Sequence, residues 1–147
     1  MADLDMCNVN AKIIDVTLTM ADHGCLTFGL VLEGDGWGQI FGGWALGHGY
    51  LGAATFEGSA AGLECLMRIM DTIGVERWED LKGNYCRIRR SQDGLIRTIG
   101  NITKNKWFDV RSFYEEVANR NKPAEAPVED KQEDAKSDQA DAKGDQA

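Results

Sequence analysis

The chain has 147 residues and a formal net charge of −8, which fits one ordinary domain with a tail. The charge is uneven, because residues 123–147 hold eight acidic and three basic side chains, whereas residues 1–122 hold sixteen acidic and thirteen basic ones. No apolar run approaches the roughly 18 residues that a bilayer requires, and residues 1–10 lack the features of a secretory signal. We therefore expect a cytosolic protein that does not enter the membrane.

The first third of the chain predicts three consecutive β-strands. Residues 11–20 are rich in β-branched side chains and alternate between apolar and polar positions. Residues 25–33 and 37–46 form two further strands, each introduced by a turn that contains glycine and aspartate. The third strand carries three glycines that predict bulges or close approach of the backbone, namely Gly38, Gly42 and Gly43.

One helix is predicted in the middle of the chain, after a loop over residues 47–58. Ser59 suits the N-cap of a helix over residues 60–73, and Gly74 suits its end. We expect the apolar stripe of this helix to face the sheet. The stripe comprises Leu63, Met67, Met70 and Ile73, widened by Leu66 and Ile69.

The following part of the chain predicts a hairpin and a second helix. Strands over residues 84–90 and 95–103 flank an Asp93-Gly94 turn, which is a strong hairpin signal. Asp109 suits the cap of a final helix over residues 110–119. The order βββαββα predicts an α+β fold with a mainly antiparallel sheet.

The domain is expected to occupy residues 1–122 and to be followed by a tail. Residues 123–147 contain no aromatic residue and one large aliphatic residue, Val128. Such a segment cannot bury enough apolar surface to offset the entropy lost on ordering. We therefore expect residues 123–147 to form a disordered acidic tail.

Residues 24–62 hold twelve of the seventeen glycines, interleaved with aromatic residues. Ordering glycine costs more backbone entropy than ordering any other residue, so the cluster needs a structural or functional reason. Strict alternation would place Trp37 and Phe41 on one face of the third strand and Trp44 on the other. Tryptophan and tyrosine are enriched at interaction hot spots. The partner-binding surface predicted from this segment comprises Trp44, His48 and Tyr50, with Trp37.

No motif in the chain supports an enzyme, a cofactor or a metal. Residues 47–52 match G-x-G-x-x-G, but a dinucleotide site needs that motif between a parallel strand and a helix. The four cysteines form no C-x-x-C pair, and neither His23 nor His48 has ligand-like spacing to another metal-binding residue. The serines lack a nucleophile elbow. We expect a protein that acts by binding and requires no cofactor or metal.

The strongest electrostatic feature is a basic hairpin over residues 82–106, which carries seven basic side chains and one acid. On a strand, Tyr85, Arg87 and Arg89 would share one face. Together with Arg97 and Lys104, such a face could hold a nucleic-acid backbone and a stacked base. The alternative, which is the more common case, is a solvated face or a set of ion pairs with the acids Glu76, Glu79 and Asp80.

Six segments of the chain carry a resemblance to known proteins: G-C-L-T-F (24–28), L-E-G-D-G-W-G (32–38), F-G-G-W-A-L-G (41–47), M-R-I-M-D-T-I-G-V (67–75), W-E-D-L-K-G-N-Y-C-R-I-R (78–89) and I-G-N-I-T-K-N-K-W-F (99–108). In this order they resemble a family of small bacteriophage and prophage proteins. The resemblance implies a phage accessory protein in a host bacterial cytoplasm. Such a protein would bind a host protein and inhibit a host defence system, as anti-CRISPR proteins do. The alternative is a small nucleic-acid-binding module of phage replication or regulation that uses the basic hairpin.

Overall fold

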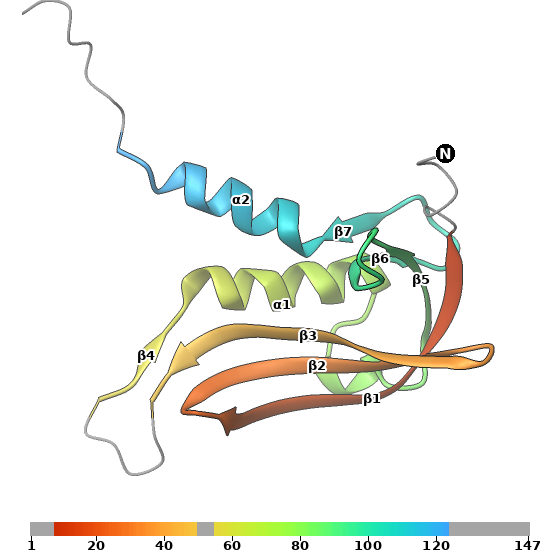
Figure 1. Ribbon diagram of the computed structural model, residues 1–147, viewed down its shortest axis with the longest axis horizontal. Helices are drawn as coiled ribbons and strands as arrows, with labels where there is room; N and C mark the ends of the chain where they lie inside the picture. Colours follow the sequence, from red (N-terminus) through yellow and green to blue (C-terminus); the bar gives the residue numbers. More distant parts are fainter. Residues whose placement is uncertain (1–7, 50–54, 124–147) are drawn as a thin grey trace, which may run out of the picture.

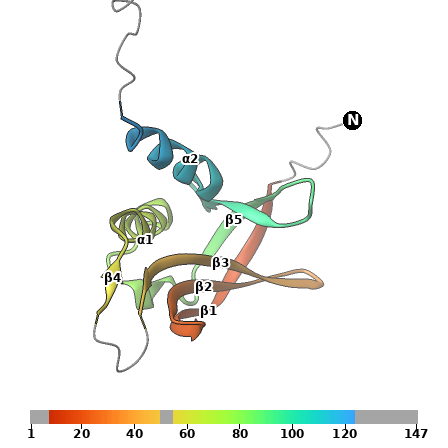
Figure 2. The same ribbon diagram turned by 60° about the vertical axis from the view of Figure 1, so that its left-hand side comes forward.

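The computed structural model describes residues 8–49 and 55–123, which form an α+β fold around one antiparallel sheet (Figure 1). The sheet has seven strands in the order β4-β3-β2-β1-β5-β6-β7. The strands are β1 (Val9–Asp22), β2 (Cys25–Gly34), β3 (Trp37–His48), β4 (Glu57–Gly58), β5 (Tyr85–Arg90), β6 (Ile96–Asn101) and β7 (Trp107–Asp109). The helices are α1 (Ala60–Ile73), the short 3₁₀ helix η2 (Trp78–Leu81) and α2 (Val110–Arg120). Both α-helices lie on the same side of β1–β3, with α1 between β3 and α2 (Figures 1 and 2).

The predicted α+β class is confirmed, but the predicted order βββαββα is incomplete. Two short strands, β4 and β7, pair with the ends of longer neighbours and extend the sheet at both edges. Strands of two or three residues carry too little alternation to be recognised in the sequence. The predicted disordered tail lies outside the described residues apart from Pro123.

A bulge in β3 changes the predicted faces of that strand. Gly42 pairs with Gly29, but Ala45 pairs with Thr27, so β3 contains one residue more than β2 over this stretch. Gly42 and the next residue, Gly43, absorb the extra residue with φ angles of 147° and 93°. A shift of one residue moves the following side chains to the opposite face. Trp44 therefore lies on the same side of the sheet as Phe41, and not on the other face as strict alternation predicted.

Helix α1 begins and ends as predicted, and four residues of its predicted stripe pack against the core, namely Leu66, Ile69, Met70 and Ile73. Leu63 and Met67 are 58% and 61% exposed, so their predicted contact with the sheet is wrong. Small residues are buried in their place, including Gly62 and Cys65. A Cβ atom at Gly62 would lie 2.8 Å from the Cα atom of Leu46, so glycine allows the helix to approach β3 closely.

The loop between β6 and β7 is fixed by the buried side chain of Asn101. The Asn101 amide donates to the carbonyl oxygens of Thr72 and Ile73 at the C-terminal end of α1, at 3.0 and 3.1 Å. The side-chain oxygen of Asn101, Oδ1, accepts from the backbone N–H groups of Thr103 and Lys104, both at 2.9 Å. One side chain therefore ties α1 to the loop that positions β7.

Candidate nucleic-acid interface

Strand β5 divides its side chains between the core and the opposite surface, as its sequence predicts. Cys86 and Ile88 are fully buried. Tyr85, Arg87 and Arg89 alternate with them and therefore point away from the core. This side of β5–β7, opposite the core, is called the outer face below.

An indole ring lies across the outer face and contacts two arginines. Gly100 on β6 pairs with Trp107 on β7 and with Arg87 on β5. A Cβ atom at Gly100 would lie 2.5 Å from the Trp107 ring, so the missing side chain leaves the space that the indole occupies. The guanidinium carbons of Arg87 and Arg89 lie 4.5 and 3.8 Å from the centroid of this ring. These distances correspond to cation–π contacts.

The two arginines on Trp107 have no carboxylate partner among residues 8–49 and 55–123. Arg87 donates to the carbonyl oxygens of Asn101 and Lys104, both at 2.7 Å. Arg89 donates from Nε to Asn8 Oδ1 at 3.0 Å. The alternative prediction, ion pairs with Glu76, Glu79 and Asp80, is not realised within the described part of the chain, where Glu79 pairs with Arg77. The outer face therefore carries positive charge that described acids do not neutralise.

Tyr85 and Lys12 extend this charged surface toward β1. They are register partners across β5 and β1, so they lie side by side on the outer face. The Lys12 ammonium lies 5.7 Å from the centroid of the Tyr85 ring, and Tyr85 is 55% exposed. We call Lys12, Tyr85, Arg87, Arg89 and Trp107 the basic face.

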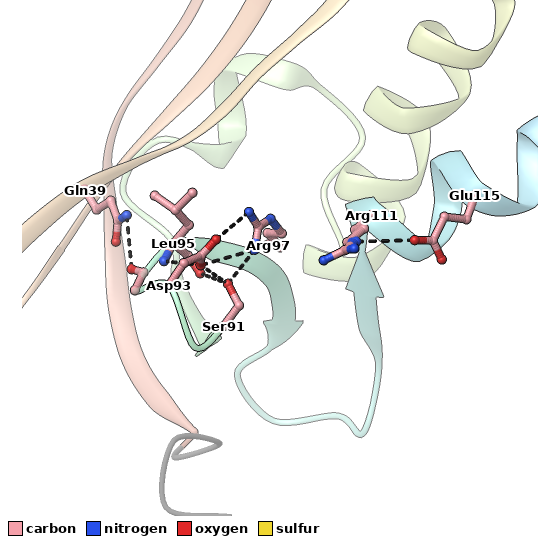
Figure 3. A network of polar contacts seen from close by, with 8 residues as sticks. Gln39, Ser91, Asp93, Leu95, Arg97, Arg111 and Glu115 are labelled. Carbon is pink, nitrogen blue, oxygen red and sulfur yellow. Dashed lines mark hydrogen bonds and ion pairs between the residues drawn. The ribbon is translucent and has the colours of Figure 1, made fainter. Parts of the chain in front are cut away.

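The other predicted nucleic-acid residues, Arg97 and Lys104, lie beside the basic face. Arg97 donates to both carboxylate oxygens of Asp93 at 3.2 and 2.7 Å (Figure 3). A hydrogen bond from Ser91 and this ion pair hold the pKa of Asp93 well below its usual range. Lys104 is exposed in the loop before β7. The charge of Arg97 is therefore partly compensated.

A hollow of about 620 Å³ lies between the β5–β6 hairpin and the start of α2. Its lining includes four arginines, namely Arg89, Arg90, Arg97 and Arg111, together with Ser91, Thr98, Trp107, Asp109, Ser112 and Glu115. Arg90 also packs over the Trp37 ring, with its guanidinium carbon 4.4 Å from the centroid. We call this hollow the arginine pocket.

The predicted partner-binding residues of the glycine-rich segment occupy different environments. Trp44 is half-buried, with its ring 6.0 Å from Phe28 and 5.7 Å from Phe41 between centroids. Trp37 is also half-buried and supports Arg90. His48 is exposed, and Tyr50 lies outside the described residues. A role for these residues in binding a partner stays a prediction.

His48 contacts a thiol that is its register partner across β2 and β3. The Cys25 sulfur lies 3.2 Å from His48 Nδ1, so the pairing of the two strands brings thiol and imidazole together. Within the part of the chain that the structure describes, no three His, Cys, Asp or Glu residues lie close enough to hold a metal ion. No helix in the same part is long and apolar enough to span a bilayer.

The molecule was also compared with known protein families, curated proteins and solved structures. None of them matches this chain. The resemblance to phage proteins therefore stays a prediction.

Sequence reasoning missed three residues of this region: Lys12, Trp107 and Arg111. A signal for one of them was present. Gly100 interrupts an apolar strand and a tryptophan follows after a short polar loop, a pattern typical of an aromatic ring covering a glycine on the neighbouring strand. Lys12 and Arg111 are joined to the region only by tertiary contacts.

Proposed function

We propose that this protein binds single-stranded nucleic acid on its basic face. The observation that supports this best is the pair of arginines held on Trp107 without a described carboxylate partner. A cation stacked on an indole loses conformational freedom before the ligand arrives, which lowers the entropic cost of binding an anion. Arginine presents a planar fork of N–H donors that matches phosphate oxygens.

Arg89 is the residue on which phosphate binding should depend most. Arg87 donates to two carbonyl oxygens of the β6–β7 loop, so part of its donor capacity is already used. Arg89 donates to one described side-chain oxygen and makes the shorter contact with Trp107. Lys12 adds a further cation to the same face.

Tyr85 explains why a single strand suits this face better than a duplex. Its ring is more than half exposed beside Lys12, Arg87 and Arg89. An unpaired base can stack on such a ring, a contact worth about 1–3 kcal/mol per base, whereas the bases of a duplex are already stacked on one another. The neighbouring cations would hold the phosphates on either side.

The test is fluorescence anisotropy of the full chain with labelled single strands of about 12 nucleotides. Three phosphate contacts, from Lys12, Arg87 and Arg89, predict a slope of log affinity against log salt of about −2. Lys12→Gln with Arg89→Gln should weaken binding by about 30-fold or more and reduce the magnitude of that slope by about 1.4. Tyr85→Ala should weaken binding with little effect on the slope.

A charge-matched control separates the basic face from net charge. Arg77→Gln with Lys122→Gln removes the same charge from two exposed positions that do not belong to the basic face. This control should bind nearly as well as the wild type. Residues 123–147 carry a net charge of −5 and could compete with nucleic acid, so a chain ending at Pro123 is measured in parallel. If neither chain binds at low salt, the proposed function is wrong.

Binding of a host protein is a second candidate, favoured by exposed apolar side chains near α1. Phe56, Leu63 and Met67 are 58–64% exposed. A hollow of about 170 Å³ beside Phe56 is lined by further apolar residues and by His48, which belongs to the predicted partner surface. A partner captured from host lysate by the wild type and released by Phe56→Ser with Leu63→Ser would support this function. Capture that is unchanged by both substitutions would contradict it.

A further inference from the structure

We infer that the arginine pocket is a binding site for a phosphate monoester, and that its source is the terminal phosphate of a strand lying on the basic face. The choice of source rests on the proposed function. The recognition of a doubly charged phosphate rests on the pocket itself. Its walls come from the β5–β6 hairpin, from β7 and from the first turns of α2.

The charges that line the pocket are not balanced. The lining holds four arginines and two carboxylates, Asp109 and Glu115, and one of the arginines, Arg97, is paired with Asp93. Asp109 is occupied by the fold, because it accepts from Thr98 Oγ1 at 2.6 Å and from the Ser112 N–H at 2.7 Å. Glu115 makes one contact of 3.3 Å with Arg111 Nε, and both side chains are about two-thirds exposed. Exposed pairs of this kind contribute little, so Arg111 can turn toward a ligand.

Arg90 gives a second, independent indication that the pocket carries uncompensated positive charge. Its Nε atom is buried and has no hydrogen-bond partner among the described residues. A buried donor without an acceptor is costly, particularly when the group is charged. The same guanidinium is held in place by the Trp37 ring. No described carboxylate pairs with this guanidinium, so Arg90 adds its positive charge to the pocket that it lines.

The size and position of the pocket favour the end of a strand. A volume of about 620 Å³ accommodates a nucleotide and greatly exceeds the space needed by phosphate alone. Arg89 and Trp107 belong both to the basic face and to the pocket lining, so the two surfaces are continuous. A strand whose bases and phosphates follow the basic face would therefore bring its terminal nucleotide to the arginines. Figure 3 shows Arg97 of β6 bonded to Asp93 and Ser91, and Arg111 of α2 paired with Glu115.

The experiment compares three labelled single strands of the same sequence, with a 5′-phosphate, with a 3′-phosphate and with neither, on the full chain. One of the phosphorylated strands should bind about tenfold more tightly than the unphosphorylated strand. Arg111→Gln should abolish that preference and leave the affinity for the unphosphorylated strand within about twofold. Arg120→Gln is the control for loss of charge, because Arg120 lies at the end of the same helix remote from the pocket, where it pairs with Glu116 and with Glu64 on α1.

Asp109→Asn provides a substitution with the opposite sign. Asparagine keeps the N-cap acceptor for α2 and removes one negative charge from the pocket lining. The preference for the phosphorylated strand should therefore increase. A loss of preference in Arg111→Gln together with a gain in Asp109→Asn cannot arise from damage to α2, because both chains should retain the wild-type circular dichroism spectrum.

The outcomes also separate this inference from the proposed function. Equal affinity for all three strands, still weakened by Lys12→Gln with Arg89→Gln, overturns the terminal-phosphate site and leaves the basic face supported. Failure of every strand to bind removes the proposed function. Titration with a nucleoside 5′-monophosphate and with inorganic phosphate then tests whether the pocket binds phosphate independently of the basic face. Binding that Arg111→Gln abolishes supports a phosphate site with a free nucleotide or free phosphate as its source, and absence of binding overturns it.

Discussion

Gly42 on β3 and Gly100 on β6 both make room for a neighbour, but the two neighbours are of different kinds. At Gly42, a Cβ atom would lie 2.3 Å from the carbonyl oxygen of Phe28, so the neighbour is the backbone of β2. At Gly100 the neighbour is the side chain of Trp107. The first glycine shapes a bulge that turns Trp44 toward the core. The second exposes a face on which an indole supports two arginines.

The contrast shows what the glycine-rich segment contributes. Its glycines bring the chain close to itself, as Gly42 does with β2 and Gly62 does with β3. Phe28, Trp37, Phe41 and Trp44 in the segment are half-buried or buried, whereas Phe56 is exposed. The β5–β7 region has fewer glycines but retains cations without described acidic partners. For this reason we propose the basic face, and not the glycine-rich segment, as the binding surface.

The largest effect is expected from Gly42→Ala. Alanine disfavours a φ of 147°, and its Cβ would overlap the β2 backbone, which cannot move without disturbing the sheet. We expect the free energy of unfolding to fall by about 4 kcal/mol, measured by urea denaturation. Gly43→Ala shares the positive φ but has no atom within 4 Å of its Cβ, so it should cost less. Equal losses for the two variants would contradict a role for close approach.

Gly100→Ala should have a smaller effect on stability and a clear effect on the basic face. The Trp107 ring can move away from a new methyl group, so we expect a loss of about 2 kcal/mol. The displaced indole should become more accessible to acrylamide, and single-strand affinity should fall because Arg89 loses its support. Gly58→Ala on β4 is the control, since a Cβ there meets nothing within 4 Å. Unchanged quenching of tryptophan fluorescence would refute this account of Gly100.

Local signals in the sequence were sufficient to predict most of the elements. Ser59 accepts from the Gly62 N–H at 3.0 Å, and Asp109 accepts from the Ser112 N–H, so both helices begin at the predicted caps. Gly74 ends α1 with a φ of 93°, as expected of a helix C-terminus. Such contacts join residues three or four positions apart, and residue type alone indicates them.

The features that could not be predicted depend on distant parts of the chain. The buried face of α1 is set by how closely Gly62 approaches β3, and apolar periodicity does not encode that distance. Trp44 changes face because of a bulge of a single residue. Trp107 lies on the outer face because three residues pair with β6. The candidate site consists mainly of such contacts, so the sequence indicated the basic hairpin and not the indole that organises it.

Substitutions of Asp109 should show how much this side chain stabilises the junction between β7 and α2. Burial acts to raise the pKa of Asp109, but hydrogen bonds from Thr98 and Ser112 outweigh it and lower the pKa. The ionised carboxylate therefore stabilises the fold above the pKa of the unfolded chain, about 3.9, and this contribution is lost as the pH falls through the lower native pKa. Asp109→Ala should cost about 1 kcal/mol near neutral pH, and Asp109→Asn should cost less. Urea denaturation across the acidic range should show a weaker pH dependence in both variants than in the wild type.

The smallest expected effect is on the reactivity of Cys25, which contacts His48 at the opposite end of the sheet from the arginine pocket. Burial raises the pKa of the Cys65 and Cys86 thiols to about 12, and both side chains are fully buried. Cys25 is half-exposed and lies 3.2 Å from His48 Nδ1. Iodoacetamide near neutral pH should therefore modify Cys25 well before Cys65 or Cys86, as followed by peptide mass spectrometry. His48→Gln should slow that modification about threefold or more, because Nδ1 lies within hydrogen-bond distance of the sulfur and can take up its proton as the sulfur is alkylated. If Cys25 reacts as slowly as Cys65, its exposure does not make it reactive. If His48→Gln leaves the rate unchanged, the contact between His48 and Cys25 has no effect on the reactivity of the thiol.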